Sequence, residues 1–227
     1  MAYMGFAWVD RVSVDGGDRL RTHVQRRDFL KLGAAGLTAA GAGSLLAAPG
    51  ARAVLPKPAE DDFGYVQFGV TAELVCEAFY RRAIAAGDWT RGERRRLALA
   101  RDGDTRHLRT LNAVLAPQGP LLRSDFEIRF PAKTFSSRER ILAQGERLEK
   151  LTVGVYIDGV TNAADPGTRA LLARLLTADA RHLAGLSELG GGTATTSGLQ
   201  AATHLEPGGR ELDTYLRFES FPNEGGA

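Results

Sequence analysis

The chain has 227 residues, of which 25% are charged and 44% are hydrophobic, a composition typical of one globular domain with additional segments. Its formal net charge is +2 and the basic residues form no stripe, so nucleic acid is not an expected partner. Cys76 is the only cysteine, which excludes a disulfide framework and any zinc finger built on cysteine ligands.

Residues 1–53 have the features of an export signal. An Arg26-Arg27 pair precedes a weakly apolar, glycine-rich stretch, which ends in an A-x-A pattern suited to signal peptidase. The segment resembles a twin-arginine signal. A membrane anchor is the alternative, but the apolar stretch is barely long enough to span a bilayer and is diluted by glycine. We therefore expect cleavage after Ala53, no stable membrane span afterwards, and a location in the periplasm, the cell wall or outside the cell.

Two helices are predicted after a short linker at residues 54–60. In residues 64–87, apolar side chains recur at three- and four-residue spacing, the periodicity of a helix with one buried face. Thr90 and Glu93 then fit the S/T-x-x-E pattern of a capping box, which predicts the start of a second helix. Pro117 ends that helix.

A long connection separates these two helices from a second pair. Residues 118–135 contain too many turn residues for a long element, and we expect no strand in the chain. Ser136 and Glu139 fit a second capping box, at the start of a third helix that the turn sequence at 164–167 interrupts. Residues 168–189 carry a fourth apolar stripe, which a run of three glycines ends.

Four amphipathic helices of roughly 20–25 residues predict an all-α fold, an antiparallel four-helix bundle. Because the middle connection is long, we expect a crossover that makes the second and third helices parallel. The bundle would occupy residues 61–191, followed by a tail at 192–227 that is rich in glycine and threonine. The sequence leaves open whether the tail stays undocked or docks through its apolar residues, which are Leu212, Tyr215, Leu216 and Phe218.

The four stripes contain polar residues that an ordinary apolar core would not hold. The first and third helices each carry E-x6-Y, and the second and fourth each carry D-x-x-H. On a helix, three residues are nearly one turn, so the carboxylate and the imidazole of D-x-x-H share a face. In chain order, the residues of this repeated pattern are Glu73, Tyr80, Asp104, His107, Glu149, Tyr156, Asp179 and His182.

Burying four carboxylates without compensation would be costly, and two divalent cations would balance their charge. Carboxylate and imidazole ligands suit iron or manganese better than zinc. Of the four histidines in the chain, the only two in the bundle belong to the D-x-x-H motifs. Buried ion pairs with Arg106 or Arg181 are the alternative.

Two stretches of the chain resemble a known family. "ELVCEAFY" and "RFPAKTFSSRERILAQGERLEKLTVGVYIDGV" are similar to exported ferritin-like proteins related to desiccation-associated proteins. The resemblance implies a centre of two iron ions, with manganese or zinc as less favoured occupants. It implies terminal carboxylates at Glu73 and Glu149, bridging ones at Asp104 and Asp179, and terminal nitrogens at His107 and His182. Tyr80 and Tyr156 would be the catalytic side chains next to the ligands, hydrogen-bonded to carboxylates.

The chain departs from the E-x-x-H motif of this class by having aspartate at both bridging positions. An aspartate is one methylene shorter, so its oxygens reach roughly 1.5 Å less far from the backbone. The helices could be closer with the site intact, or the site could bind one metal or none. Gly103, beside Asp104, permits a local adjustment or marks a decayed site.

These features predict a secreted ferritin-like protein that oxidises Fe(II) or handles peroxide, with metal ions and dioxygen or peroxide as partners. The alternative is a metal-free helical bundle, acting as an envelope stress or binding protein without catalysis. Either could be a homo-oligomer.

Other polar residues fit structural roles. We expect Cys76 to be a reduced packing residue and Glu77 to form an ion pair with Arg81. Asp158, near the end of the third helix, is expected to be solvated.

Overall fold

The computed structural model describes residues 55–193 and 200–218. The interpretation of residues 1–53 as an export signal therefore lies outside the described residues. No helix in the described ranges is long and apolar enough to cross a membrane.

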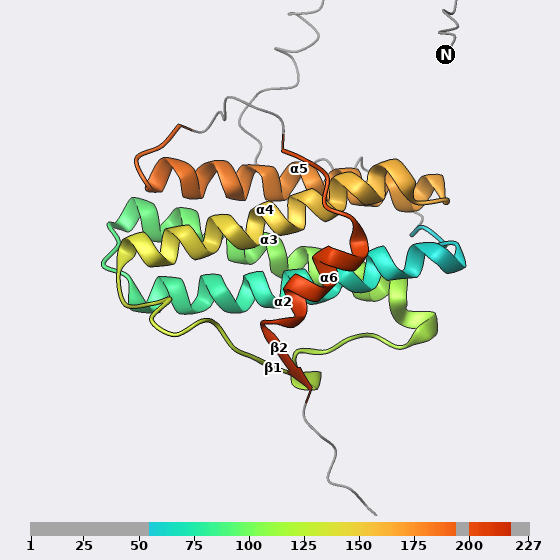
Figure 1. Ribbon diagram of the computed structural model, residues 1–227, viewed down its shortest axis with the longest axis horizontal. Coiled ribbons are helices and arrows are strands. Elements are labelled where there is room, and N and C mark those ends of the chain that lie inside the picture. Colours follow the sequence, from blue (N-terminus) through green and yellow to red (C-terminus); the bar gives the residue numbers. More distant parts are fainter. Residues whose placement is uncertain (1–54, 194–199, 219–227) are drawn as a thin grey trace, which may run out of the picture. The chain divides into compact units, whose positions relative to one another are not determined.

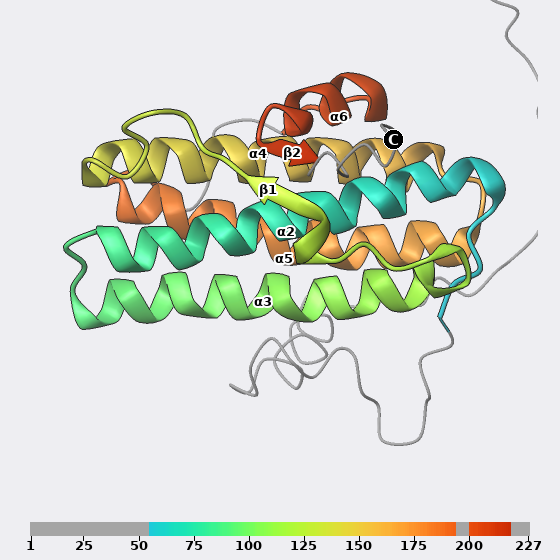
Figure 2. The same ribbon diagram turned by 90° about the horizontal axis from the view of Figure 1, so that it is seen from below.

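Four long helices form the body of the structure (Figures 1 and 2). Helix α2 pairs with α3 and α4 pairs with α5, while α2 also contacts α4 and α3 contacts α5. The predicted all-α bundle is confirmed. The bounds of these helices are α2 (Phe63–Ala86), α3 (Arg91–Leu115), α4 (Arg138–Asn162) and α5 (Pro166–Leu189).

The connection between α3 and α4 runs back along the bundle, so these two helices point in the same direction (Figures 1 and 2). This is the predicted crossover. Because of it, each helix pair is antiparallel within itself, and the two pairs face each other across one shared core. Short 3-10 helices precede α2 at η2 (Glu60–Asp62), follow α3 at η3 (Ala116–Gln118) and lie within the long connection at η4 (Arg123–Asp125).

The two predicted capping boxes have different outcomes. At the start of α3, the Thr90 hydroxyl accepts a hydrogen bond from the amide of Glu93 at 3.3 Å, and the Glu93 carboxylate accepts one from the Thr90 amide at 2.8 Å. At the start of α4, the prediction is wrong by one residue. Ser137, not Ser136, is the cap, and its hydroxyl accepts from the amide of Arg140 at 3.4 Å.

The expectation of no strand is also wrong, though only for two segments of three residues. β1 (Phe126–Ile128) and β2 (Leu216–Phe218) pair antiparallel, with Phe126 opposite Phe218. Each segment is too short to show a period of two, and its partner lies far away in the chain. Local sequence patterns therefore could not reveal the pairing.

The tail docks on the bundle. Helix α6 (Leu205–Asp213) packs on α2 and α4, as Figure 2 shows. Leu212, Tyr215 and Leu216 are buried, and the Tyr215 hydroxyl accepts a hydrogen bond from the Gln144 amide at 2.9 Å. The side chain of Phe218 lies outside the described residues.

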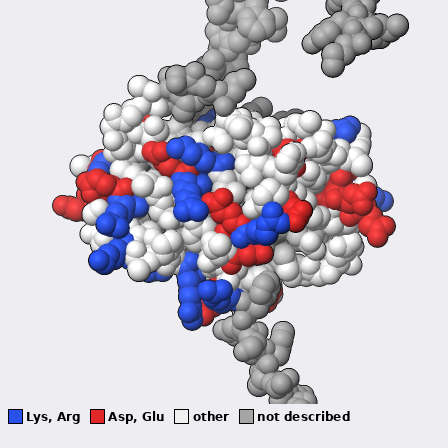
Figure 3. All heavy atoms as spheres, in the orientation of Figure 1, with Lys and Arg blue, Asp and Glu red and all other residues white. Residues whose placement is uncertain are grey.

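Charged side chains are mixed on the face shown in Figure 3, where Lys and Arg lie among Asp and Glu. This face therefore has no broad area of one sign, which agrees with the near balance of basic and acidic residues in the sequence.

Candidate metal centre

One carboxylate from each of the four long helices enters the middle of the bundle, together with two imidazoles. All four carboxylate residues are at most 2% exposed. The D-x-x-H spacing places the aspartate and the histidine of α3, and likewise those of α5, on one helix face. The residues are Glu73 on α2, Asp104 and His107 on α3, Glu149 on α4, and Asp179 and His182 on α5.

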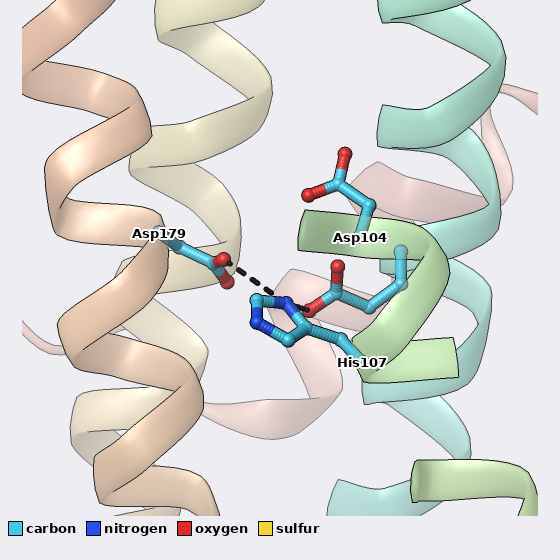
Figure 4. Close-up of side chains that lie close together, drawn as sticks. Asp104, His107 and Asp179 are labelled. Carbon is cyan, nitrogen blue, oxygen red and sulfur yellow. Dashed lines mark hydrogen bonds and ion pairs between the residues drawn. The ribbon is translucent and has the colours of Figure 1, made fainter. Parts of the chain in front are cut away.

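One part of this cluster is centred on His107. Its Nδ1 atom lies 3.2 Å from Oε1 of Glu73 and 3.6 Å from Oδ1 of Asp179. Figure 4 shows Asp179 on α5 pointing across to His107 and Asp104 on α3. One potential ligand atom from each of these four residues lies within 4.8 Å of the others, so they can hold one metal ion.

The other part is centred on His182. Its Nδ1 atom lies 3.4 Å from Oδ1 of Asp104 and 3.6 Å from oxygens of both Glu149 and Asp179. A second group of potential ligands consists of Glu149, Asp179 and His182. Asp179 belongs to both groups and is therefore placed to bridge two ions. The rings of His107 and His182 stack with centroids 6.2 Å apart.

Four buried polar atoms in the described part of the chain lack a hydrogen-bond partner, and all four belong to this cluster. They are Oδ2 of Asp104, both carboxylate oxygens of Asp179 and Nδ1 of His182. Leaving such atoms unpaired is costly, and these residues have potential ligand atoms close together, so they are candidates to bind a cation. Oxygen and imidazole donors fit iron or manganese, so the residues present suit the metals implied by the sequence.

The alternative of buried ion pairs with arginine is wrong. Arg106 and Arg181 are both exposed, and no ion pair joins either of them to a cluster carboxylate in the described residues. At these helix positions, the long side chains point away from the core while the neighbouring aspartate and histidine point into it.

Two tyrosine hydroxyls donate hydrogen bonds to the two glutamates of the cluster. The Tyr80 hydroxyl on α2 donates to Oε1 of Glu149 on α4 at 2.5 Å. In the opposite direction, the Tyr156 hydroxyl on α4 donates to Oε1 of Glu73 on α2 at 3.0 Å. Burial, together with the charges of Glu149 and Glu73 respectively, raises the pKa of both hydroxyls well above the ordinary value. The tyrosines therefore remain protonated donors that fix the orientation of the carboxylates.

Burial makes the cluster hold protons when it holds no metal. It raises the pKa of Glu73 to about 8, with the negative charge of Glu149 acting in the same direction. The pKa values of Asp104 and Asp179 are raised well above the ordinary value, first by burial and then by the neighbouring glutamates. A metal ion would have to displace these protons, so metal binding should strengthen as the pH rises.

The two histidines respond differently to the same surroundings. Burial lowers the pKa of His107, and the charges of Asp179 and Glu149 only partly oppose this effect. Burial also disfavours the charged form of His182, but the nearby carboxylate of Glu149, together with those of Asp179 and Glu73, raises its pKa overall. The two imidazoles are therefore not equivalent in the metal-free cluster.

Asp158 contradicts the sequence-based expectation of a solvated residue. It is 3% exposed and accepts hydrogen bonds from the hydroxyl of Tyr65 at 2.8 Å and the amide of Asn162 at 2.9 Å. Nδ1 of His204 lies 2.9 Å from the same carboxylate. The tail brings His204 to the end of α4, a long-range contact that helix periodicity cannot predict.

The remaining expectations about single residues are confirmed. Cys76 is a free, buried cysteine in the core. A carboxylate oxygen of Glu77 lies 3.5 Å from the guanidinium of Arg81, one helical turn further along α2.

The fold and the cluster together define a helical bundle of the metal-binding class, with carboxylates from all four helices facing paired histidines. A family model described as a ferritin-like domain matches residues 61–191, which is more than half of the chain. The chain therefore belongs to the ferritin-like family. No curated protein and no solved structure matches it.

Proposed function

We propose that the cluster holds two iron ions and that the protein oxidises Fe(II) with dioxygen or peroxide. The observation that carries this proposal is the convergence of unpaired buried atoms from Asp104, Asp179 and His182 at the centre of the bundle. Four ionised carboxylates would balance two divalent cations, which removes the cost of burying them.

The geometry supports a specific assignment of ligands. Glu73 and His107 would bind one ion, and Glu149 and His182 the other, with Asp179 between them. Asp104 belongs to the group around His107, yet its Oδ1 lies only 3.4 Å from Nδ1 of His182, so it also lies between the two positions. The aspartates can thus take the bridging role despite their shorter side chains.

The chemistry that bound iron supplies is electron transfer to dioxygen or peroxide. Iron held there would supply one electron per ion, so reduction of one peroxide to two water molecules would oxidise two Fe(II) to Fe(III) and consume two protons. The protein's part is to orient the glutamates through Tyr80 and Tyr156 and to keep the carboxylates out of bulk water. His107 and His182, at 15% and 13% side-chain exposure, are the cluster residues nearest to solvent.

Metal analysis of protein matured in its own host tests the proposal, combined with anaerobic Fe(II) loading followed by addition of peroxide. We expect two ions per chain and oxidation of the added Fe(II). Asp179→Asn should remove both, because Asp179 belongs to both ligand groups. Asp102→Asn, on the same helix as Asp104 but paired with Arg101 at the surface, should behave like the wild type.

A wild-type protein that carries no metal and does not oxidise Fe(II) would contradict the proposal. It would favour the alternative function, a metal-free helical bundle that acts as an envelope stress or binding protein. Occupancy by manganese or zinc alone would retain the site but reject iron chemistry.

We also propose that the chain is exported through the twin-arginine route, as in the exported branch of ferritin-like proteins. Its support is the Arg26-Arg27 pair and the apolar stretch that follows. Export in the folded state suits a protein that must take its metal in the cytoplasm, because copper outcompetes iron and manganese at most sites. Changing both arginines to lysine should trap the precursor, since lysine lacks the planar guanidinium. Normal export of that variant would contradict the proposal.

A further inference from the structure

A glycine in the middle of α3 lies against one of the two imidazoles. Gly103 is buried and directly precedes Asp104. A Cβ atom built at Gly103 would lie 3.0 Å from both Cε1 and Nε2 of His182. This is tighter than nine in ten Cβ contacts, so with any other residue at position 103 the imidazole would have to shift by a few tenths of an ångström.

Two rings and a carboxylate lie next to the ring of His182. The ring of Tyr80 meets it edge-on at 6.1 Å, and the ring of His107 stacks on it at 6.2 Å. Its Nδ1 atom faces the carboxylate of Asp104 at 3.4 Å. Because Cε1 is bonded to Nδ1, a methyl group that pushes Cε1 also displaces the potential ligand atom.

The other half of the bundle has no equivalent glycine. The residue that precedes Asp179 on α5 is Ala178, in the position that corresponds to Gly103. A helix-interior glycine is destabilising relative to alanine. On α3, the close approach of the His182 ring gives a local reason for glycine at position 103.

We infer that Gly103 is a positioning residue for His182, and that it specifically maintains the metal position formed by Glu149, Asp179 and His182. The inference rests on the proposed metal centre. It predicts that a methyl group at position 103 weakens one metal position and leaves the other, around His107, in place.

The test compares Gly103→Ala with Gly185→Ala. Gly185 also lies inside a helix, three residues after His182, and a Cβ there would meet nothing within 4 Å. Anaerobic calorimetric titration with Co(II) should give two ions per chain for the wild type and Gly185→Ala. For Gly103→Ala we expect one ion at unchanged affinity and the second at least about tenfold weaker. Two ions at wild-type affinities, or equal weakening of both, would overturn the inference.

A measurement without metal separates this inference from the proposed function. In NMR spectra of the metal-free protein, Gly103→Ala should shift the imidazole signals of His182 and leave those of His107 nearly unchanged. Unchanged His182 signals would overturn the inference whatever the metal content. If the wild type binds no Co(II), the proposed centre fails, and the NMR comparison still decides the role of Gly103.

A double-mutant cycle covers the case in which Gly103→Ala folds poorly. In the His182→Ala background, the same change should raise the melting temperature, as helix propensity predicts. In the wild-type background, it should lower the melting temperature or prevent folding. The same response to Gly103→Ala in both backgrounds would show that the His182 ring is not the obstacle, and would overturn the inference.

Discussion

The two sides of the bundle differ in how far they bury the residues that they contribute to the cluster. Helices α2 and α4 form a covered wall, on which α6 packs. Helices α3 and α5 form the opposite wall, on which α6 does not pack, and which we call the open wall for the described residues. The covered wall supplies Glu73 and Glu149, each at most 2% exposed, while His107 and His182 on the open wall retain 15% and 13% side-chain exposure.

This difference separates two tasks. On the covered wall, Tyr80 and Tyr156 cross-link the glutamates of α2 and α4, which fixes the carboxylates before any metal arrives. The histidines of the open wall lie nearest to solvent, where metal ions and oxidants would enter. A rigid side that excludes water fixes the ligand geometry of a metal centre, and an accessible side allows exchange with solution.

The largest expected effect concerns the covering helix. Leu212→Ala on α6 removes a side chain that is 2% exposed, so it should lower the free energy of unfolding by about 2–5 kcal/mol in a urea titration. Leu99→Ala, on α3 and 58% exposed, is the matched control and should change stability little. If Leu212→Ala lowers the free energy of unfolding no more than Leu99→Ala does, α6 does not stabilise the covered wall.

A smaller effect is expected from the tyrosine cross-links. Tyr80→Phe keeps the ring but removes the 2.5 Å hydrogen bond to a buried carboxylate, so it should cost about 1.5–3 kcal/mol in chemical unfolding at pH 8. Tyr156→Phe removes the longer bond of 3.0 Å and should cost less. If Tyr156→Phe lowers the free energy of unfolding as much as Tyr80→Phe or more, the two hydrogen bonds do not differ in strength as their lengths indicate.

The most gradual effect is a pH dependence of the metal-free protein. The pKa of Glu73 is raised from 4.5 to about 8 in the folded state, so the folded protein retains a proton that the unfolded chain has released. Stability should therefore be highest below pH 4.5 for this group and fall as the pH rises to about 8, by at most about 1.4 kcal/mol per pH unit for each retained proton.

Glu73→Gln isolates the contribution of Glu73 to the pH dependence, because an amide does not titrate over this range. The variant should flatten the fall in stability between pH 5 and pH 8. Glu146→Gln, which alters an exposed pair with Lys150 on α4, should leave the slope unchanged. A wild-type protein whose stability rises over this range would show that Glu73 is ionised in the metal-free fold.

Helix periodicity and residue spacing predicted much of this structure. The four stripes and the long connection predicted the bundle and its crossover, since burial of one face determines where a helix packs. The D-x-x-H spacing predicted that Asp179 and His182 would point inward together, and the structure places them beside Asp104 and His107.

The remainder depends on contacts between residues far apart in the chain. The pairing of β1 with β2 and the contact of Asp158 with His204 of the tail have no local signal in the sequence. Asp179 lies near both histidines, while a Cβ atom at position 103 would meet only His182, and both facts follow from how α3 and α5 approach each other. Sequence spacing specifies which face of a helix a residue occupies, but not how closely two helices approach each other.

The most direct test of the metal centre is thermal unfolding with and without anaerobic Fe(II). Binding to the folded state alone should raise the free energy of unfolding of the wild type by about 2.7 kcal/mol at a hundredfold excess over the dissociation constant. Asp179→Asn should lose that gain, because Asp179 belongs to both ligand groups, and should be no less stable than the wild type without metal. A wild type whose unfolding is indifferent to Fe(II) would contradict the account.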